Sequence, residues 1–319
     1  MKQNSKNLNF KTNFKAEIGF LLTSLSIFVF AMCLSTLFSP VISEGVRSGI
    51  SFCISVIIPS AFPFMILADL LLYFMHFEKI KAARELFFRL FKINGYAISV
   101  LLTGLISGFP IGAKLARELY ISGKISKKEC ERLIGFSNNA SPAFVISGIG
   151  FGLLGSLKTG VFLYFISVIS SLTAGLIWAL FAKREICVAC DYSDSFSFTN
   201  SIKSATKATL NICGFICFFS VIIDLLCKII KSELALAVIS SFLEVGNASR
   251  FITELNLSYT IKLPLLAFAI SFSGISVLFQ SKSILSDTDI SMKIYYVMKL
   301  FSGILSASLT FLSISLFCA

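Results

Sequence analysis

The 319 residues are 56% hydrophobic and only 14% charged, with 34 phenylalanines and a mean hydropathy of +0.86. A soluble domain is about 45–50% apolar and about a quarter charged, so this composition excludes a soluble protein and predicts an all-α polytopic membrane protein. The net charge of +11 lies in short basic segments beside apolar spans, a pattern that the positive-inside rule explains better than nucleic-acid binding does.

Apolar runs near the length of a membrane helix mark the predicted crossings. They lie close to residues 18–38, 50–75, 136–157, 159–182, 208–230 and 294–318. A basic, polar segment over 1–17 precedes the first run, which is longer than a signal-peptide core and lacks an Ala-x-Ala site, so we interpret it as a retained transmembrane helix. Two shorter or broken runs lie near 96–112 and 261–280. The sequence therefore predicts about six crossings plus two re-entrant broken helices.

Charge counts predict the side on which each loop lies. The segments with an excess of Lys and Arg are 2–16, 76–95, 113–133 and 183–207, and the net-neutral segments are 39–49, 231–262 and 281–293. Because such an excess marks the cytoplasmic side, the four basic segments and both chain termini are expected there, and residue 287 is expected on the opposite side from residue 124. Segment 76–95 also alternates basic and apolar residues at helical spacing, which predicts an interfacial amphipathic helix.

The run 96–112 would then have both ends in the cytoplasm, so we expect it to enter the membrane and return. Pro110 lies between Gly108 and Gly112. This chemistry suits a break, because proline lacks an N–H donor and glycine permits unusual backbone angles. Non-helical backbone at membrane depth is tolerated only where protein or a watery cavity surrounds it. The alternative is a short, kinked helix that crosses completely.

The two halves of the chain show a loose internal likeness. The paired segments are 56–71 with 210–226, which places Asp69 opposite Asp224, and 107–114 with 273–280. Because the paired segments would run in opposite directions, the pattern predicts inverted repeats over 50–182 and 205–318, as in secondary transporters. Broken segments at corresponding positions would then mark the substrate site.

Polar residues around the predicted breaks are candidates for substrate binding. Lys114 lies four residues after Pro110 and would place a cation at the tip of the hairpin, whereas we interpret the charges beyond it as a solvated cytoplasmic face. Asn138 and Asn139 begin an apolar run just before Pro142. Their amides offer donors and acceptors without charge, which suits ligand binding. The alternative is hydrogen bonding between helices.

Ionisable residues inside predicted spans are candidates for ion or proton coupling, because such residues are costly in a membrane. They are Asp69, Asp224, Lys228 and Lys299. Asp224 and Lys228 are four residues apart and could neutralise each other. Asp69 has no partner nearby in the sequence, so it could titrate or could pair with Lys114 or Lys299.

Other polar features carry less weight. Glu244, in a marginally apolar stretch, is a weaker candidate for a membrane-embedded site. Cys187 and Cys190 form a Cys-x-x-Cys pair without a second pair or a nearby histidine, which does not favour a zinc or redox site. The sequence contains a single histidine, His76, which excludes histidine-rich sites. No enzyme motif is present, and neither a metal nor a cofactor is expected.

Residues 108–142, GFPIGAKLARELYISGKISKKECERLIGFSNNASP, resemble the signature of sporulation integral membrane proteins of the YlbJ type, which carry a nucleoside recognition or Gate domain. The matching positions are Gly108, Pro110, Gly112, Ala113, Lys114, Gly123, Lys124, Glu131, Arg132, Leu133, Asn138, Asn139 and Pro142. The sequence departs at Ile111, where a small polar residue is usual, and at Ala140 and Ser141, where Ser-Gly is usual. The likeness extends more loosely over most of the chain.

This resemblance implies a transporter that moves dipicolinic acid from the mother cell into the forespore across the outer forespore membrane. Dipicolinate is a small aromatic dianion, so a site with Lys114, Asn138 and Asn139 would suit it chemically. The expected mechanism is alternating access within the lipid bilayer, and a homo-oligomer is compatible with the sequence. The alternatives are a carrier of nucleosides or other small metabolites, and a non-transporting scaffold of a sporulation complex.

Overall fold

The computed structural model describes residues 26, 32, 36, 38–74, 80–182 and 197–317, which form helices joined by turns and loops and contain no strand. The chain divides into two compact units, Met1–Glu44 and Gly45–Ala319. The predicted basic terminus over 1–17, most of the predicted helix over 18–38, His76, Cys187 and Cys190 lie outside the described residues.

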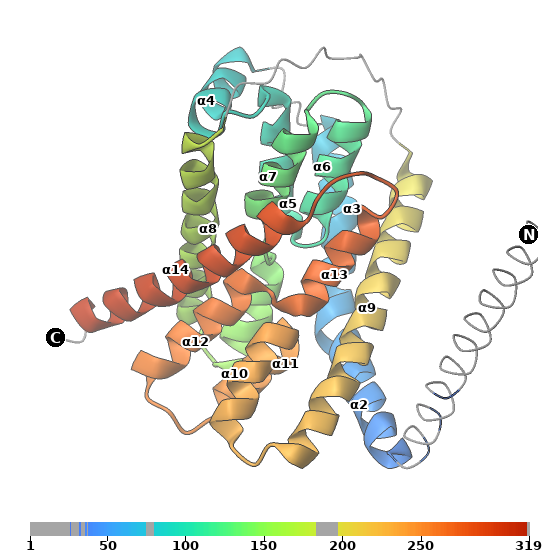
Figure 1. Cartoon of the computed structure of the whole chain (residues 1–319), viewed down its shortest axis with the longest axis vertical. Coiled ribbons are helices and arrows are strands. Elements are labelled where there is room, and N and C mark those ends of the chain that lie inside the picture. The colour runs from blue at the N-terminus through green and yellow to red at the C-terminus, as the bar shows by residue number, and fades with distance from the viewer. Residues whose placement is uncertain are drawn as a thin grey trace, which may run out of the picture. The chain divides into compact units, whose positions relative to one another are not determined.

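The helices follow one another along the chain as labelled in Figure 1. They are α2 (Ser39–Phe52), η1 (Cys53–Ile57), α3 (Ile58–Phe74), α4 (Lys81–Phe91), η3 (Gly95–Ala97), α5 (Ile98–Ser107), α6 (Ile111–Ile121), α7 (Lys127–Ser137), η4 (Ala143–Leu153), α8 (Leu157–Leu180), α9 (Phe198–Ile229), α10 (Glu233–Leu243), α11 (Val245–Glu254), α12 (Tyr259–Phe272), α13 (Gly274–Ile284) and α14 (Lys293–Phe317). η1 and η4 are π-helical, and η3 is a 3-10 turn.

Several helices have the length and composition of membrane spans. They are Ser39–Ile57, Leu157–Leu180, Phe198–Ile229, Tyr259–Ile284 and Lys293–Leu316. The bent pair Lys81–Phe91 and Gly95–Ser107, whose parts meet at 99°, adds a sixth if it is counted as one span. The prediction of an all-α polytopic membrane protein is confirmed. The predicted runs 159–182, 208–230 and 294–318 correspond closely to α8, α9 and α14.

The predicted run 50–75 begins too late, because α2, η1 and α3 form one continuous helical stretch from Ser39. Gly45 and Gly49 explain how its first part packs. A Cβ atom at Gly45 would lie 2.7 Å from the Cα of Val221, and one at Gly49 would lie 2.8 Å from the Cα of Cys217. Small residues thus let α2 approach the backbone of α9 directly.

α5 and α6 pack side by side and form a helical hairpin. Its turn contains Gly108, with a φ of 81°, and a cis bond between Phe109 and Pro110. α5 ends at Ser107, and α6 begins at Ile111 and returns along it. This is the geometry expected of a segment that enters the membrane and returns, and the break predicted around Pro110 is confirmed.

The second hairpin is formed by α10 and α11, not by the predicted segment 261–280. Glu244 separates the two helices and caps α11, because its carboxylate accepts hydrogen bonds from the backbone N–H groups of Gly246 and Asn247. Within 261–280, Ser273 and Gly274 have φ values of 71° and 77° and separate α12 from α13. These two helices nevertheless form one stretch long enough to cross a membrane.

The predicted span 136–157 is a broken helix. α7 ends at Ser137, and η4 begins at Ala143 after the non-helical residues 138–141. The break predicted around Asn138 and Asn139 is therefore confirmed.

Each half of the chain contains a hairpin, a broken helix and an uninterrupted helix, in that order. In the first half these are α5–α6, α7–η4 and α8. In the second half they are α10–α11, α12–α13 and α14. This order pairs the turn at Gly108 with Glu244, and the break at 138–141 with the break at Ser273. The pairing of 107–114 with 273–280 is therefore wrong, because it matches a hairpin turn to a broken helix.

The described parts of three basic segments lie together, in agreement with the prediction that they share one side. In α7, Arg132 donates to the carbonyl oxygens of Phe91 and Lys92 at 2.9 and 2.8 Å. Lys114 of α6 donates to Ser204 Oγ in α9 at 2.7 Å. One of these basic segments, 76–95, is also predicted to be an amphipathic helix. It contains α4, and the apolar side chains of Phe87 and Phe91 on that helix are buried.

The neutral segment 281–293 also lies against this group, contrary to the expectation that it lies on the opposite side. The backbone N–H of Ser291 donates to Glu131 Oε1 at 2.8 Å, and Lys127 Nζ pairs with Asp289 at 3.0 Å. The segment is neutral because its aspartates balance its lysines, and those aspartates bind basic residues of α6 and α7. Net charge therefore misplaces this loop.

Candidate functional site

A pocket lies where both hairpin turns meet both broken helices. The empty space there amounts to about 470 Å³ when the open solvent at its mouth is included. Gly108 lines it from the first turn, Ser141 from the first break, Glu244 from the second turn and Gln280 from the helix after the second break. Apolar residues of α3 and α9 complete the wall. Binding sites for small molecules typically combine a mostly apolar wall with a few polar groups.

The first turn and the first break touch through their backbones. A Cβ atom at Gly104 would lie 2.2 Å from the Ser137 carbonyl oxygen, and one at Gly112 would lie 2.6 Å from the same atom. At Gly108 a Cβ would lie 2.7 Å from the Ser141 nitrogen. The glycines predicted to permit the break therefore also allow α5 and α6 to press directly against the end of α7.

The second turn and the second break make the equivalent contact. A Cβ atom at Gly274 would lie 2.9 Å from the carbonyl oxygen of Leu243 and 3.0 Å from the nitrogen of Glu244. Glu244 is buried, and its carboxylate also accepts from Asn247 Nδ2 at 3.0 Å. In each half, then, a hairpin turn is fixed to a broken helix without an intervening side chain.

Two polar atoms at the pocket wall have no hydrogen-bond partner in the part of the chain that the structure describes. Ser107 Oγ and Gln280 Oε1 are buried and make no hydrogen bond to any described residue. Gln280 is held through its other amide atom, Nε2, which donates to Ser276 Oγ at 3.3 Å. The rings of Phe109 and Phe144, both at the pocket wall, meet edge to face at 6.4 Å. Because buried polar atoms are normally satisfied, the free ones mark a place for a ligand or water.

Asn138, Asn139 and Lys299 come together in one buried cluster behind the break at 138–141. Lys299 is fully buried, and its Nζ donates to the Asn138 carbonyl oxygen at 3.0 Å and to Asn139 Oδ1 at 3.2 Å. Asn138 Nδ2 donates to Ser281 Oγ at 2.9 Å and to Tyr295 OH at 2.8 Å. The cluster therefore joins the first broken helix to α13 and α14 of the other half.

Asn139 is held from its own half as well. Its Nδ2 donates to the Phe136 carbonyl oxygen at 2.7 Å, and its Oδ1 accepts from Ser171 Oγ of α8 at 2.6 Å. Both asparagines thus make the hydrogen bonds between helices that were the alternative to direct substrate binding, and neither lines the pocket. Pro142 begins the helical stretch after the break.

Lys114 does not line the pocket, and its Nζ is bound to Ser204 of α9. Besides Ser204, its Nζ lies 4.0 Å from Asp69 Oδ1 and 3.9 Å from Glu118 Oε1. Asp69 therefore has Lys114, and not Lys299, as its basic neighbour. A role for Lys114 in direct substrate contact stays a prediction that this geometry does not favour.

The other candidates for ion coupling lie near the end of α9. Asp224 is half-buried and Lys228 is exposed. Neither residue lines the pocket.

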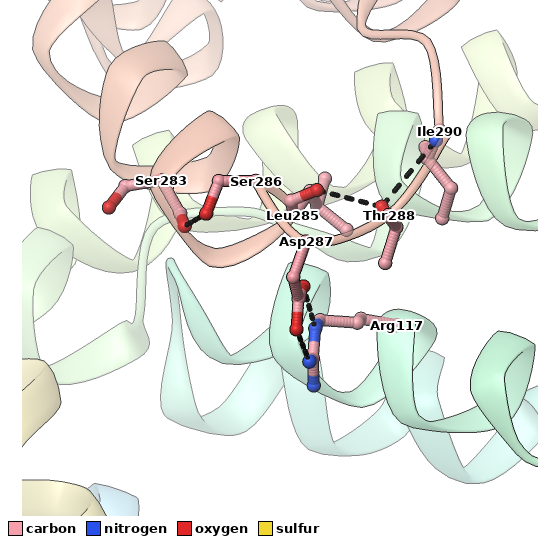
Figure 2. Close-up of polar contacts among 7 residues, drawn as sticks. All are labelled: Arg117, Ser283, Leu285, Ser286, Asp287, Thr288 and Ile290. Carbon is pink, nitrogen blue, oxygen red and sulfur yellow. Dashed lines mark hydrogen bonds and ion pairs between the residues drawn. The ribbon is translucent and has the colours of Figure 1, made fainter.

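The loop between α13 and α14 binds the first hairpin. Figure 2 shows Asp287 facing the guanidinium of Arg117, which donates to both carboxylate oxygens. This hydrogen bond lowers the pKa of Asp287. Tyr120 OH and Lys127 Nζ donate to Asp289 at 2.7 and 3.0 Å and lower the pKa of that carboxyl as well.

Reasoning from the sequence missed Ser107, Gln280 and Tyr295, and it ranked Glu244 too low. Isolated Ser, Gln and Tyr residues in apolar runs carry no local signal, and glutamate is not among the usual N-cap residues, so Glu244 did not mark the start of a helix either. Within the described ranges, no group of three or more His, Cys, Asp or Glu side chains could hold a metal ion.

The sequence is similar to the sporulation integral membrane protein YlbJ of Bacillus subtilis (strain 168). The two are 26% identical over 307 aligned residues, which cover 83% of this chain and 75% of the relative. No family model matches the sequence, and no solved structure is similar to it. The similarity supports the resemblance to proteins of the YlbJ type, whereas a nucleoside recognition or Gate domain stays a prediction.

Proposed function

We propose that this protein is a sporulation-associated membrane transporter that moves a small ring-bearing solute by alternating access. Its first candidate solute is dipicolinic acid, carried from the mother cell to the forespore across the outer forespore membrane. The name of the YlbJ relative supports a role in sporulation. The observation that carries the transport proposal is the pocket at which two hairpin turns meet two broken helices.

The packing around the pocket suits alternating access. Gly108 packs against the backbone and the Cβ of Ser141 within the first half, and Gly274 packs against the backbone of Leu243 within the second. Each turn is therefore expected to move together with its own broken helix. In secondary transporters, substrates bind near such broken segments, and one repeat rocks against the other around the site.

The pocket offers a ring-bearing solute several matching groups. Phe109 and Phe144 supply aromatic surface, and the free oxygens of Ser107 and Gln280 supply polar partners. The carboxyl group of Glu244 is also at the wall. As a carboxylate it would repel the dianionic form of dipicolinate, so transport of that solute requires either a protonated Glu244 or a partly protonated solute.

Glu244 is also the observation that favours a second candidate, a neutral ring-bearing metabolite such as a nucleoside. A carboxylate and a glutamine can both bind hydroxyl and amino groups, and such a solute brings no charge to repel. The same pocket would serve either solute, so the two candidates differ in what Glu244 does.

Uptake into proteoliposomes tests the proposal. Wild type is compared with Glu244→Gln, and Glu254→Gln, at the exposed end of the same helix, is the matched control. With labelled dipicolinate, Glu244→Gln should raise uptake at neutral pH, because a repulsive charge is removed. With labelled uridine it should lower uptake, because a strong acceptor is lost. Accumulation of neither solute above that of empty vesicles would refute the two solute proposals and favour a scaffold.

A further inference from the structure

Lys299 is a fully buried lysine that the proposed transport path does not use. It lies in α14 and reaches the break of the first broken helix, where its Nζ has two oxygen partners, the Asn138 carbonyl and Asn139 Oδ1. No ion pair with a described residue accompanies these contacts. A buried amine bound only by neutral oxygens, and far from solvent, requires an explanation.

The oxygens around Lys299 are of the kind that bind a monovalent cation. The Asn138 carbonyl is released from helical bonding by the break, and unwound carbonyls of this sort coordinate Na⁺ in many transporters. Asn139 Oδ1 is fixed by Ser171 at 2.6 Å. Asn138 Oδ1 is buried and has no partner among the described residues, so a third oxygen is available at the break.

We propose that the Lys299 ammonium permanently occupies the place of a coupling cation at this break, so that the protein works without binding Na⁺ or K⁺ there. In its protonated form the Lys299 side chain supplies the positive charge that the released oxygens attract, and its covalent attachment keeps it in the site. The role of Lys299 in ion coupling rests on the proposed transport function, but the cation site itself can be tested without a transport assay.

Thermal unfolding of purified full-length variants tests the site. Unfolding is followed in NaCl, KCl and choline chloride at equal ionic strength and pH. Wild type should melt at one temperature in all three salts. Lys299→Ala vacates the oxygens and should melt higher in Na⁺ or K⁺ than in choline, by about 2 °C if the cation exceeds its dissociation constant roughly tenfold.

Two control variants separate this effect from general destabilisation. Lys299→Met fills the space without a charge and should be destabilised equally in all salts. Lys262 also donates to a backbone carbonyl, that of Thr253 at 2.9 Å, but it lies half-buried at a helix end. Lys262→Ala should therefore gain no preference for any cation.

Three results would overturn the inference. In the first, the wild-type protein melts at a higher temperature in NaCl than in choline chloride. In the second, solute uptake by the wild type requires Na⁺ or K⁺. In the third, the Lys299→Ala variant melts at the same temperature in all three salts or fails to fold in any of them. A failure of the transport proposal looks different, because wild type would then take up no solute in any salt while the melting comparison still gives its result.

Discussion

Replacing Gly112 by alanine should loosen the contact between the first hairpin and the first broken helix. The new Cβ atom would lie 2.6 Å from the Ser137 carbonyl oxygen, 2.8 Å from the Ser137 carbonyl carbon and 2.9 Å from the Asn138 Cα. All three are backbone atoms and cannot rotate away. The helices must therefore separate by about 0.8 Å to restore an ordinary contact of 3.4 Å.

The expected cost follows from two opposing effects. Overpacking of this kind costs about 1–3 kcal/mol, and alanine returns up to about 1 kcal/mol of helix propensity. For a chain of this length, a net loss of about 1–2 kcal/mol corresponds to a melting temperature lower by about 1.5–3 °C. Gly214 in α9 is the matched control, because a Cβ there would meet no heavy atom within 4 Å. Gly214→Ala should therefore be neutral or slightly stabilising.

Fluorescence of the single tryptophan reports the unfolding in detergent. Trp178 of α8 packs edge to face against Phe301 at 5.7 Å and should change its emission when the helices separate. The packing argument is refuted if Gly112→Ala melts at the same temperature as Gly214→Ala.

Further predictions concern charge and topology. Lys114→Ala should reduce solute uptake less than Gln280→Ala does, because Gln280 lines the pocket and Lys114 does not. A larger loss of uptake in Lys114→Ala would instead indicate that Lys114 binds the substrate. The Asp287 carboxyl has a lowered pKa because a guanidinium of α6 hydrogen-bonds it, so the loop contact should be complete at neutral pH and be lost only as the pH falls through that lowered pKa. Amide hydrogen exchange of the loop, corrected for the intrinsic rate, should therefore speed up as the pH falls through this pKa. The Asp287→Asn variant should show no such change with pH. If its exchange still speeds up in the same way, Asp287 is not the group that titrates. Single cysteines that replace Lys124 and Asp287 should be labelled from the same side of the membrane, and a single cysteine that replaces Leu257 should be labelled from the opposite side. Any other result contradicts the pairing of the α5–α6 hairpin with the α10–α11 hairpin.

The sequence predicts those features that leave a local chemical signal. Apolar length identifies α8, α9 and α14, the Gly108–Gly112 stretch identifies the first turn, and Asn138 with Asn139 identifies the first break. The second hairpin has a weaker signal, because α10 and α11 are separated by a single residue, Glu244, without glycine or proline. The prediction fell on 261–280 instead, because that apolar run is short and its end can be paired with 107–114, although the chain continues across the break at Ser273.

Features that depend on distant contacts could not be predicted. Asn139 and Lys299 are both unusual in the sequence, but 160 residues separate them, and no local pattern indicates that they meet. The same holds for Ser107 and Gln280, which become notable only because the fold leaves their oxygens without partners. The side of the 281–293 segment was misjudged because the binding of Asp287 to Arg117 is invisible to a charge count.

The central claim is that a solute binds where the two turns meet the two breaks, and protection of a cysteine at position 141 tests it most directly. In a variant whose nine native cysteines are replaced, Ser141→Cys puts a thiol of similar size at the pocket wall. The transported solute should slow labelling of this thiol at least severalfold and should leave a thiol at the exposed loop position 286 unaffected. Uptake of a solute that does not slow labelling at position 141 would contradict the account.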